Sequence, residues 1–154
     1  MESNSNINIT FVREVRLRYR KPKPTNAFDA VLSPDKAAAF MRRLLPDNVR
    51  EHFLALFLDS RRLVVGYLVA ATGTADCCPV GARELFQAAV VVGAVGMVVG
   101  HSHISGSPIP SPEDGEVTAR LHQAGALLGI PVFDHVIISY EAYYSFRQAN
   151  RMPA

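Results

Sequence analysis

Two consecutive segments of this 154-residue chain are almost entirely apolar, and each has the length of a β-strand. They read HFLALFLD (residues 52–59) and LVVGYLVAA (residues 63–71), and only three residues separate them. A strand that faces water on one side alternates apolar with polar residues, whereas a strand covered on both faces is continuously apolar. The pattern therefore predicts a sheet with helices packed against both of its faces, which is a three-layer α/β domain.

The rest of the chain alternates helical and strand patterns. Apolar residues at helical spacing, bounded by serine, proline and glycine, predict helices at residues 34–45, 80–94 and 112–128. Short apolar runs predict buried strands at residues 97–99 and 132–139 and a final edge strand at residues 143–147. We expect a basic arm with its linker at residues 1–26 and one domain, with a mixed sheet, at residues 27–154.

Composition excludes several classes of protein. Hydrophobic residues make up 49% and charged residues 19%, which fits a compact globular domain. The two cysteines, Cys77 and Cys78, are adjacent, which argues against a disulfide scaffold and for a reducing compartment. The N-terminus has no signal-peptide pattern, and the longest apolar stretch, residues 88–100, is too short to span a bilayer. We expect a cytoplasmic protein without membrane contact.

The positive charge of the chain is concentrated at its start. Residues 1–24 hold six basic and two acidic residues, although the whole chain carries only +2. Arg16, Arg18 and Arg20 alternate with apolar residues, so a strand here would carry a stripe of guanidinium groups on one face. Three interpretations remain open: a solvated edge that discourages aggregation, a surface for nucleic-acid phosphates, or an edge that pairs in a homodimer.

A candidate metal site follows the predicted strand at residues 97–99. His101 and His103 are two residues apart, so an extended backbone places both imidazoles on the same side. Asp114, in the first turn of the next predicted helix, could supply a third ligand. Three protein ligands on zinc leave one tetrahedral position for water, as in catalytic sites. Asp114 also has a structural interpretation, because Ser111 and Asp114 have the spacing of a helix capping box.

The candidate ligands form a spaced motif that resembles the H-[ST]-H-x7-S-x2-D signature of the JAMM (MPN+/JAB) metalloproteases. The motif consists of His101-Ser102-His103, then seven residues, Ser111, two more residues and Asp114. The segment HSHISGSPIPSPEDGEVTARLHQAGALLGIPVFDH and the later YYSFR resemble bacterial RadC-type JAB domains, and the likeness covers residues 33–148. Ser102 and Ile104 depart from the usual H-N-H-P-S-G of that type. We expect a basic arm in place of the helix-hairpin-helix region of longer RadC proteins, so DNA binding is not carried over.

The resemblance implies a fold, a cofactor and a reaction. The fold would be the three-layer α-β-α JAB/MPN domain with a cytidine-deaminase-like sheet. One zinc ion would be held by His101, His103 and Asp114, and Ser111 would lie beside the activated water and help to hold the developing oxyanion. The reaction would be hydrolysis of a peptide or isopeptide bond in a protein or peptide substrate, with an upstream glutamate as general base.

Two glutamates precede the metal motif at positions suited to that base. Glu51 stands at the start of the first buried strand, which is the position that the resemblance favours, and Glu84 stands in the first turns of the predicted helix at residues 80–94. We favour Glu51. The pair Asp134–His135 falls in the middle of the last buried strand, where it would either support the metal ligands or be a satisfied core pair.

A function of another class also fits the sequence. The chain could be a nucleic-acid-associated accessory module, in DNA repair or a mobile element, whose metal site is structural or vestigial and whose arm binds phosphate.

This second hypothesis predicts a steep loss of DNA affinity between low and physiological salt, because each phosphate contact releases counterions. Neutral replacements of Arg16, Arg18 and Arg20 should flatten that dependence in a fluorescence-anisotropy titration. DNA binding that is unchanged after removal of residues 1–24 would contradict a role for the arm.

Overall fold

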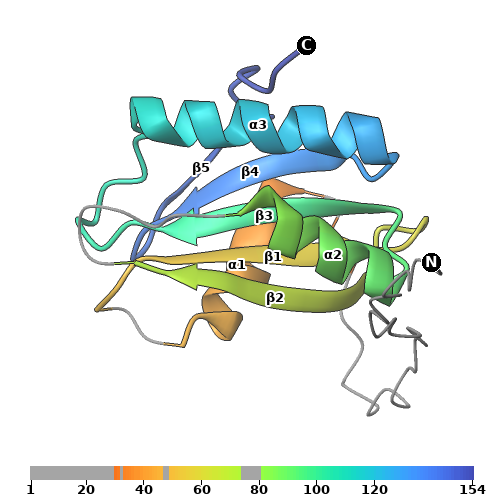
Figure 1. Ribbon diagram of the computed structural model, residues 1–154. Helices are drawn as coiled ribbons and strands as arrows, with labels where there is room; N and C mark the ends of the chain where they lie inside the picture. Colours follow the sequence, from red (N-terminus) through yellow and green to blue (C-terminus); the bar gives the residue numbers. More distant parts are fainter. Residues whose placement is uncertain (1–29, 32, 47–48, 74–80) are drawn as a thin grey trace, which may run out of the picture.

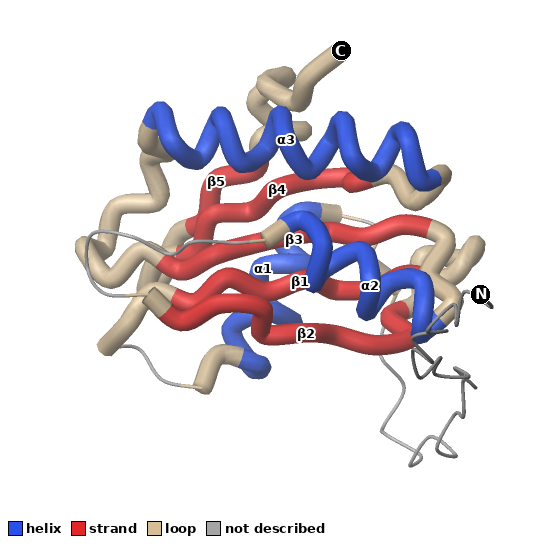
Figure 2. Tube along the Cα trace, in the orientation of Figure 1, coloured by secondary structure: helices blue, strands red, loops and turns tan. Residues whose placement is uncertain are grey.

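The computed structural model of the protein describes residues 30–31, 33–46, 49–73 and 81–154 (Figures 1 and 2). Its elements in chain order are α1 (Pro34–Leu44), β1 (His52–Leu58), β2 (Val64–Thr72), α2 (Ala82–Val92), β3 (Gly96–Ser102), α3 (Pro112–Leu128), β4 (Val132–Ile138) and β5 (Tyr143–Ser145). The arm with its arginines and the Cys77–Cys78 pair lie outside the described residues. No helix in the described ranges is long and apolar enough to cross a membrane.

The five strands form one mixed sheet in the order β2-β1-β3-β4-β5. β1 runs antiparallel to both of its neighbours, β3 and β4 are parallel, and β5 is antiparallel to β4. All seven residues of β1 and all seven of β3 are buried, because these strands lie inside the sheet and are covered on both faces. The continuous apolar pattern of residues 52–58 is explained by this central position.

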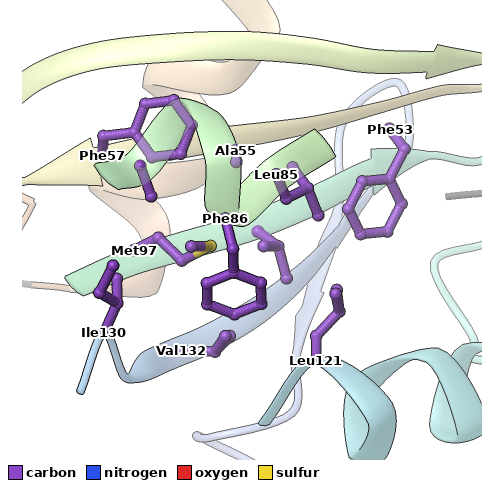
Figure 3. Packing of buried hydrophobic residues seen from close by; sticks show 11 residues of the cluster. Phe53, Ala55, Phe57, Leu85, Phe86, Met97, Leu121, Ile130 and Val132 are labelled. Atoms are coloured by element: carbon purple, nitrogen blue, oxygen red, sulfur yellow. The ribbon is translucent and has the colours of Figure 1, made fainter. Parts of the chain in front are cut away.

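Helices cover the two faces of the sheet unequally, with α1 on one face and α2 and α3 on the other (Figure 2). On the α2/α3 face, Phe53 and Phe57 of β1 pack with Leu85 and Phe86 of α2 and Leu121 of α3 (Figure 3). On the opposite face, buried residues of α1 such as Met41 pack against the alternate residues of β1 and β3. The predicted three-layer α/β architecture is confirmed.

The structure differs from the sequence expectations in several details, and α2 and β5 are shorter than expected. β3 extends to Ser102 instead of ending at residue 99, so His101 is a strand residue. β2 is partly exposed, with Val65 at 44% and Tyr67 at 54%, because it is an outer strand of the sheet. Ser33 occupies the N-cap position of α1 but makes no side-chain cap, and its hydroxyl instead bonds the Asp35 carboxylate.

Gly100 allows α1 to approach the sheet directly beside the candidate metal site. A Cβ at this position would lie 2.5 Å from Sδ of Met41 and 2.7 Å from the backbone oxygen of Val136. Met41 is fully buried, and the Val136 carbonyl belongs to the neighbouring strand, so neither atom has room to move away. A residue without a side chain is therefore required one position before His101.

Gly100→Ala should lower the free energy of unfolding by about 1–3 kcal/mol, the usual cost of overpacking a filled core. The matched control is Gly115→Ala in α3, where a Cβ would meet no atom within 4 Å. It should stabilise the helix by about 0.5–1 kcal/mol, because alanine loses less backbone entropy than glycine. Urea denaturation measures both, and a Gly100→Ala protein as stable as the parent would contradict the close-packing argument.

Candidate metal centre

The three predicted metal ligands meet at the edge of the sheet where β3 and β4 end and β1 begins. His101 lies in β3, and His103 follows the strand with its backbone N–H bonded to the Ile138 oxygen at 2.8 Å. Asp114 lies in the first turn of α3, which starts at this edge (Figure 1). The side chains of His101, His103 and Asp114 offer ligand atoms that all lie within 4.8 Å of one another.

The spacing of the donor atoms suits a small cation. Nε2 of His101 lies 2.8 Å from Nε2 of His103 and 3.1 Å from Oδ1 of Asp114. Nε2 of His103 lies 3.5 Å from Oδ2 of Asp114. Tetrahedral ligands at about 2.0–2.1 Å from a zinc ion are separated by about 3.3–3.4 Å, which falls within this range. The donor set, two imidazoles and one carboxylate, is one that zinc and related divalent metals accept.

His103 is oriented by the loop that joins β3 to α3. Its Nδ1 lies 3.0 Å from the backbone oxygen of Ser107. A carbonyl oxygen can only accept, so Nδ1 carries a proton, and the nitrogen that must lose its proton to bind a metal is Nε2, which faces Asp114. The loop thus presents His103 in the tautomer that a metal requires.

The electrostatics of the site keep the carboxylate ionised. Burial raises the pKa of Asp114, but hydrogen bonds with His101, His103 and the Ser111 N–H outweigh burial and hold it far below its usual range. The pKa of His103 is raised, and the largest cause is its hydrogen bond with Asp114. Burial lowers this pKa, but the Ser107 carbonyl and the negative charges of Asp114 and Glu51 raise it further. Negative charge thus accumulates at a point where two imidazole nitrogens also converge, which favours a bound cation.

Asp114 serves as a helix cap at the same time. Ser111 is the N-cap of α3, its Oγ accepts from the Asp114 N–H at 3.2 Å, and its own N–H donates to Oδ2 of Asp114 at 2.7 Å. Oδ1 of Asp114 remains directed at His101. The capping interpretation and the metal interpretation are therefore compatible.

Glu51 and Glu84 occupy different environments. β1 and β3 pair Phe53 with His101, and continuing this antiparallel register by two residues pairs Glu51 with His103, on the face that carries both histidines. Glu84 is exposed on α2, and its carboxylate folds back over Gly81 at the start of its own helix. The strand register therefore favours Glu51 as the acidic residue beside the site.

Asp134 and His135 do not act as a pair, because neighbours in a strand point to opposite faces. On the α1 face, Asp134 accepts from Ser145 Oγ at 2.6 Å and from the Arg147 N–H at 3.0 Å. On the α3 face, Nε2 of His135 lies 2.9 Å from Nδ1 of His101. Asp134 is therefore a satisfied core residue, and only His135 contacts a candidate ligand.

Three neighbours of the site were not predicted. Phe53 stacks on His101 with an interplanar angle of 6°, and Phe146 stacks on His135 at 9°. Thr118 contacts both Asp114 and His135. The sequence did contain a signal for Thr118. It follows Asp114 by four residues, and residues four apart lie on the same side of a helix.

A cavity of about 330 Å³ opens beside His103, between α1 and the ends of β3 and β4. Its walls include Leu45, Ile104 and Ile138, and Arg42 contributes a guanidinium group that donates to the Ala142 oxygen at 2.7 Å. Of the three candidate ligands, His103 alone lines this cavity.

Comparison with known proteins gives the family. A model of the RadC-like JAB domain matches residues 31–151, which include the whole described sheet and all three candidate ligands. The chain belongs to the RadC-like JAB domain family. The predicted resemblance to RadC-type domains is thereby confirmed.

Relatives of this RadC-like JAB domain occur in several bacteria under the name UPF0758 protein, which states no activity. The protein of Trichlorobacter lovleyi is 40% identical over 118 residues, 77% of this chain and 51% of the relative. That of Thermotoga maritima is 40% identical over 103 residues, 67% of this chain and 46% of the relative. The chain thus spans about half the length of these relatives.

The geometry predicts that the protein binds one equivalent of a divalent transition metal. His103→Ala should remove most of the metal, because two remaining ligands hold such an ion poorly. Elemental analysis after purification without chelators measures the occupancy. Full occupancy in a variant with both His101 and His103 changed to alanine would contradict the site.

Proposed function

We propose that this RadC-like JAB domain is a zinc-dependent hydrolase that cleaves a peptide or isopeptide bond. The observation that supports the proposal most directly is the convergence of His101, His103 and Asp114 at the sheet edge where β1 begins, directly after Glu51. Three protein ligands leave a coordination position for water, and the carboxylate of the residue before β1 supplies a base.

Each residue has a defined role in this proposal. A zinc ion held by His101, His103 and Asp114 would acidify a water molecule and polarise the carbonyl of the scissile bond. Glu51 takes the proton from the attacking water and returns it to the leaving nitrogen. The Ser111 hydroxyl accepts from the Asp114 N–H, so its own hydrogen can be donated to the carbonyl oxygen as negative charge develops there.

The substrate class follows from the chemistry of the site and the space beside it. A zinc site with a carboxylate base suits an amide bond, whose nitrogen must be protonated before it leaves. The cavity beside His103 can take a residue next to that bond, with apolar walls and a guanidinium group at Arg42. The nucleic-acid and homodimer hypotheses depend on residues 1–24, outside the described part of the chain, and stay predictions.

Glu51→Gln tests the mechanism, because glutamine keeps the shape of the side chain but cannot accept the proton. The variant should fold, retain about one equivalent of zinc, and lose hydrolytic activity by about 10²–10⁴-fold, the usual contribution of general acid–base catalysis. Turnover is measured on a substrate selected from peptide and isopeptide libraries with the parent protein.

Glu84→Gln is the matched control and should leave turnover nearly intact, since this carboxylate lies at the start of its own helix. Loss of activity in Glu84→Gln but not in Glu51→Gln would show that the wrong glutamate was chosen. Full activity in both variants would overturn the glutamate-base mechanism.

A further inference from the structure

A continuous series of hydrogen bonds leads from the backbone of α3 to the candidate metal ligand His101. Oγ1 of Thr118 lies 2.6 Å from the backbone oxygen of Asp114 and 2.7 Å from Nδ1 of His135. Nε2 of His135 lies 2.9 Å from Nδ1 of His101. The series therefore connects one candidate ligand, Asp114, to another, His101, through two buried side chains that the proposed reaction does not use.

The direction of every bond in this series follows from its first member. The Asp114 carbonyl can only accept, and two oxygens 2.6 Å apart need a hydrogen between them, so the Thr118 hydroxyl donates to it. Because the single hydroxyl hydrogen of Thr118 is used in the bond to Asp114, its oxygen can only accept from His135, whose Nδ1 therefore carries a hydrogen. A neutral imidazole has one N–H, so Nε2 of His135 accepts from Nδ1–H of His101.

The burial and the ring positions of His135 support this order. Its side chain is fully buried, and its two ring nitrogens contact the Thr118 hydroxyl and another imidazole. A buried positive charge requires a paired negative group, and neither contact supplies one, so the ring is neutral. Phe146 stacks on His135 and Phe53 stacks on His101, with ring centroids 5.1 and 5.9 Å apart. Neither ring can turn over without displacing a buried aromatic side chain.

We propose that Thr118 and His135 are positioning residues that hold His101 in the Nδ1–H tautomer, which directs the lone pair of Nε2 at the metal position. The inference rests on the proposed metal site. If the series ran in the opposite direction, Nε2 of His101 would carry the proton and could not bind a metal. His103 reaches the same tautomer through the Ser107 carbonyl, so each histidine ligand has its own orienting acceptor.

The tautomers can be measured directly on the full chain by ¹⁵N NMR of the imidazole rings, in the metal-free and the zinc-loaded protein at pH 8. The expected spectra show protonated Nδ1 and unprotonated Nε2 for His135 in both states, and protonated Nδ1 for His101. A proton on Nε2 of His135 together with an unprotonated Nδ1 of His101 would overturn the proposal, and this measurement needs no variant to fold.

Thr118→Val removes the hydroxyl with little change in volume and should weaken zinc binding about 10–100-fold, the usual effect of losing an outer partner of a metal ligand. Zinc affinity is measured by competition with a chromophoric chelator. Thr118→Ser keeps the hydroxyl and should restore the affinity and the parent ¹⁵N spectrum. A purely structural role for Thr118 would instead lower thermal stability while leaving the affinity and the tautomers unchanged, and that result would overturn the proposal.

Thr72→Val is the matched control, because Thr72 Oγ1 bonds Nδ1 of a different buried histidine, His52, at 3.0 Å. Its zinc affinity should equal that of the parent, and an equal loss in both valine variants would overturn the specific role of Thr118. If the parent protein binds zinc and Thr118→Val binds it equally well, this inference fails and the metal site stands. If the parent binds no zinc, the proposed function and this inference both fail.

Discussion

The antiparallel pairing of β1 with β3 is the constraint on which both the core and the site depend. These are the two strands whose every residue is buried, and their register pairs Phe53 with His101. Burial of their apolar side chains from both faces provides the main driving force for the sheet. The same register stacks an aromatic ring on one candidate ligand and brings the start of β1, with Glu51, to the other.

Asp114 links the stability of α3 to the chemistry of the site. One of its oxygens completes the capping box with Ser111, and the other is directed at His101. Helix N-termini favour a negative charge, so the carboxylate that caps α3 is also held in the ionised form that a metal needs. The carboxylate of Asp114 therefore stabilises α3 and is one of the three candidate metal ligands.

The coarse fold and the candidate ligands could be predicted from short-range pattern. Continuous apolar runs predicted the covered strands, the boundaries of α3 were predicted to the residue, and the spacing of His101, His103 and Asp114 predicted that they meet. The pair Asp134–His135 could not be interpreted in this way. Its two members face opposite layers, and only the order of the strands shows that His135 lies beside His101 while Asp134 caps the turn after β5.

The sequence by itself determined which residues are apolar, where α3 begins and ends, and which side chains can bind a metal, because these depend on side-chain chemistry and on neighbours a few positions away. Only the tertiary structure decided that Thr118 and His135 complete a hydrogen-bond series with His101, and that Gly100 must lack a side chain where α1 meets the sheet. Those relations join residues up to 59 positions apart. Close packing of separate layers brings such residues into contact, and no local sequence pattern predicts it.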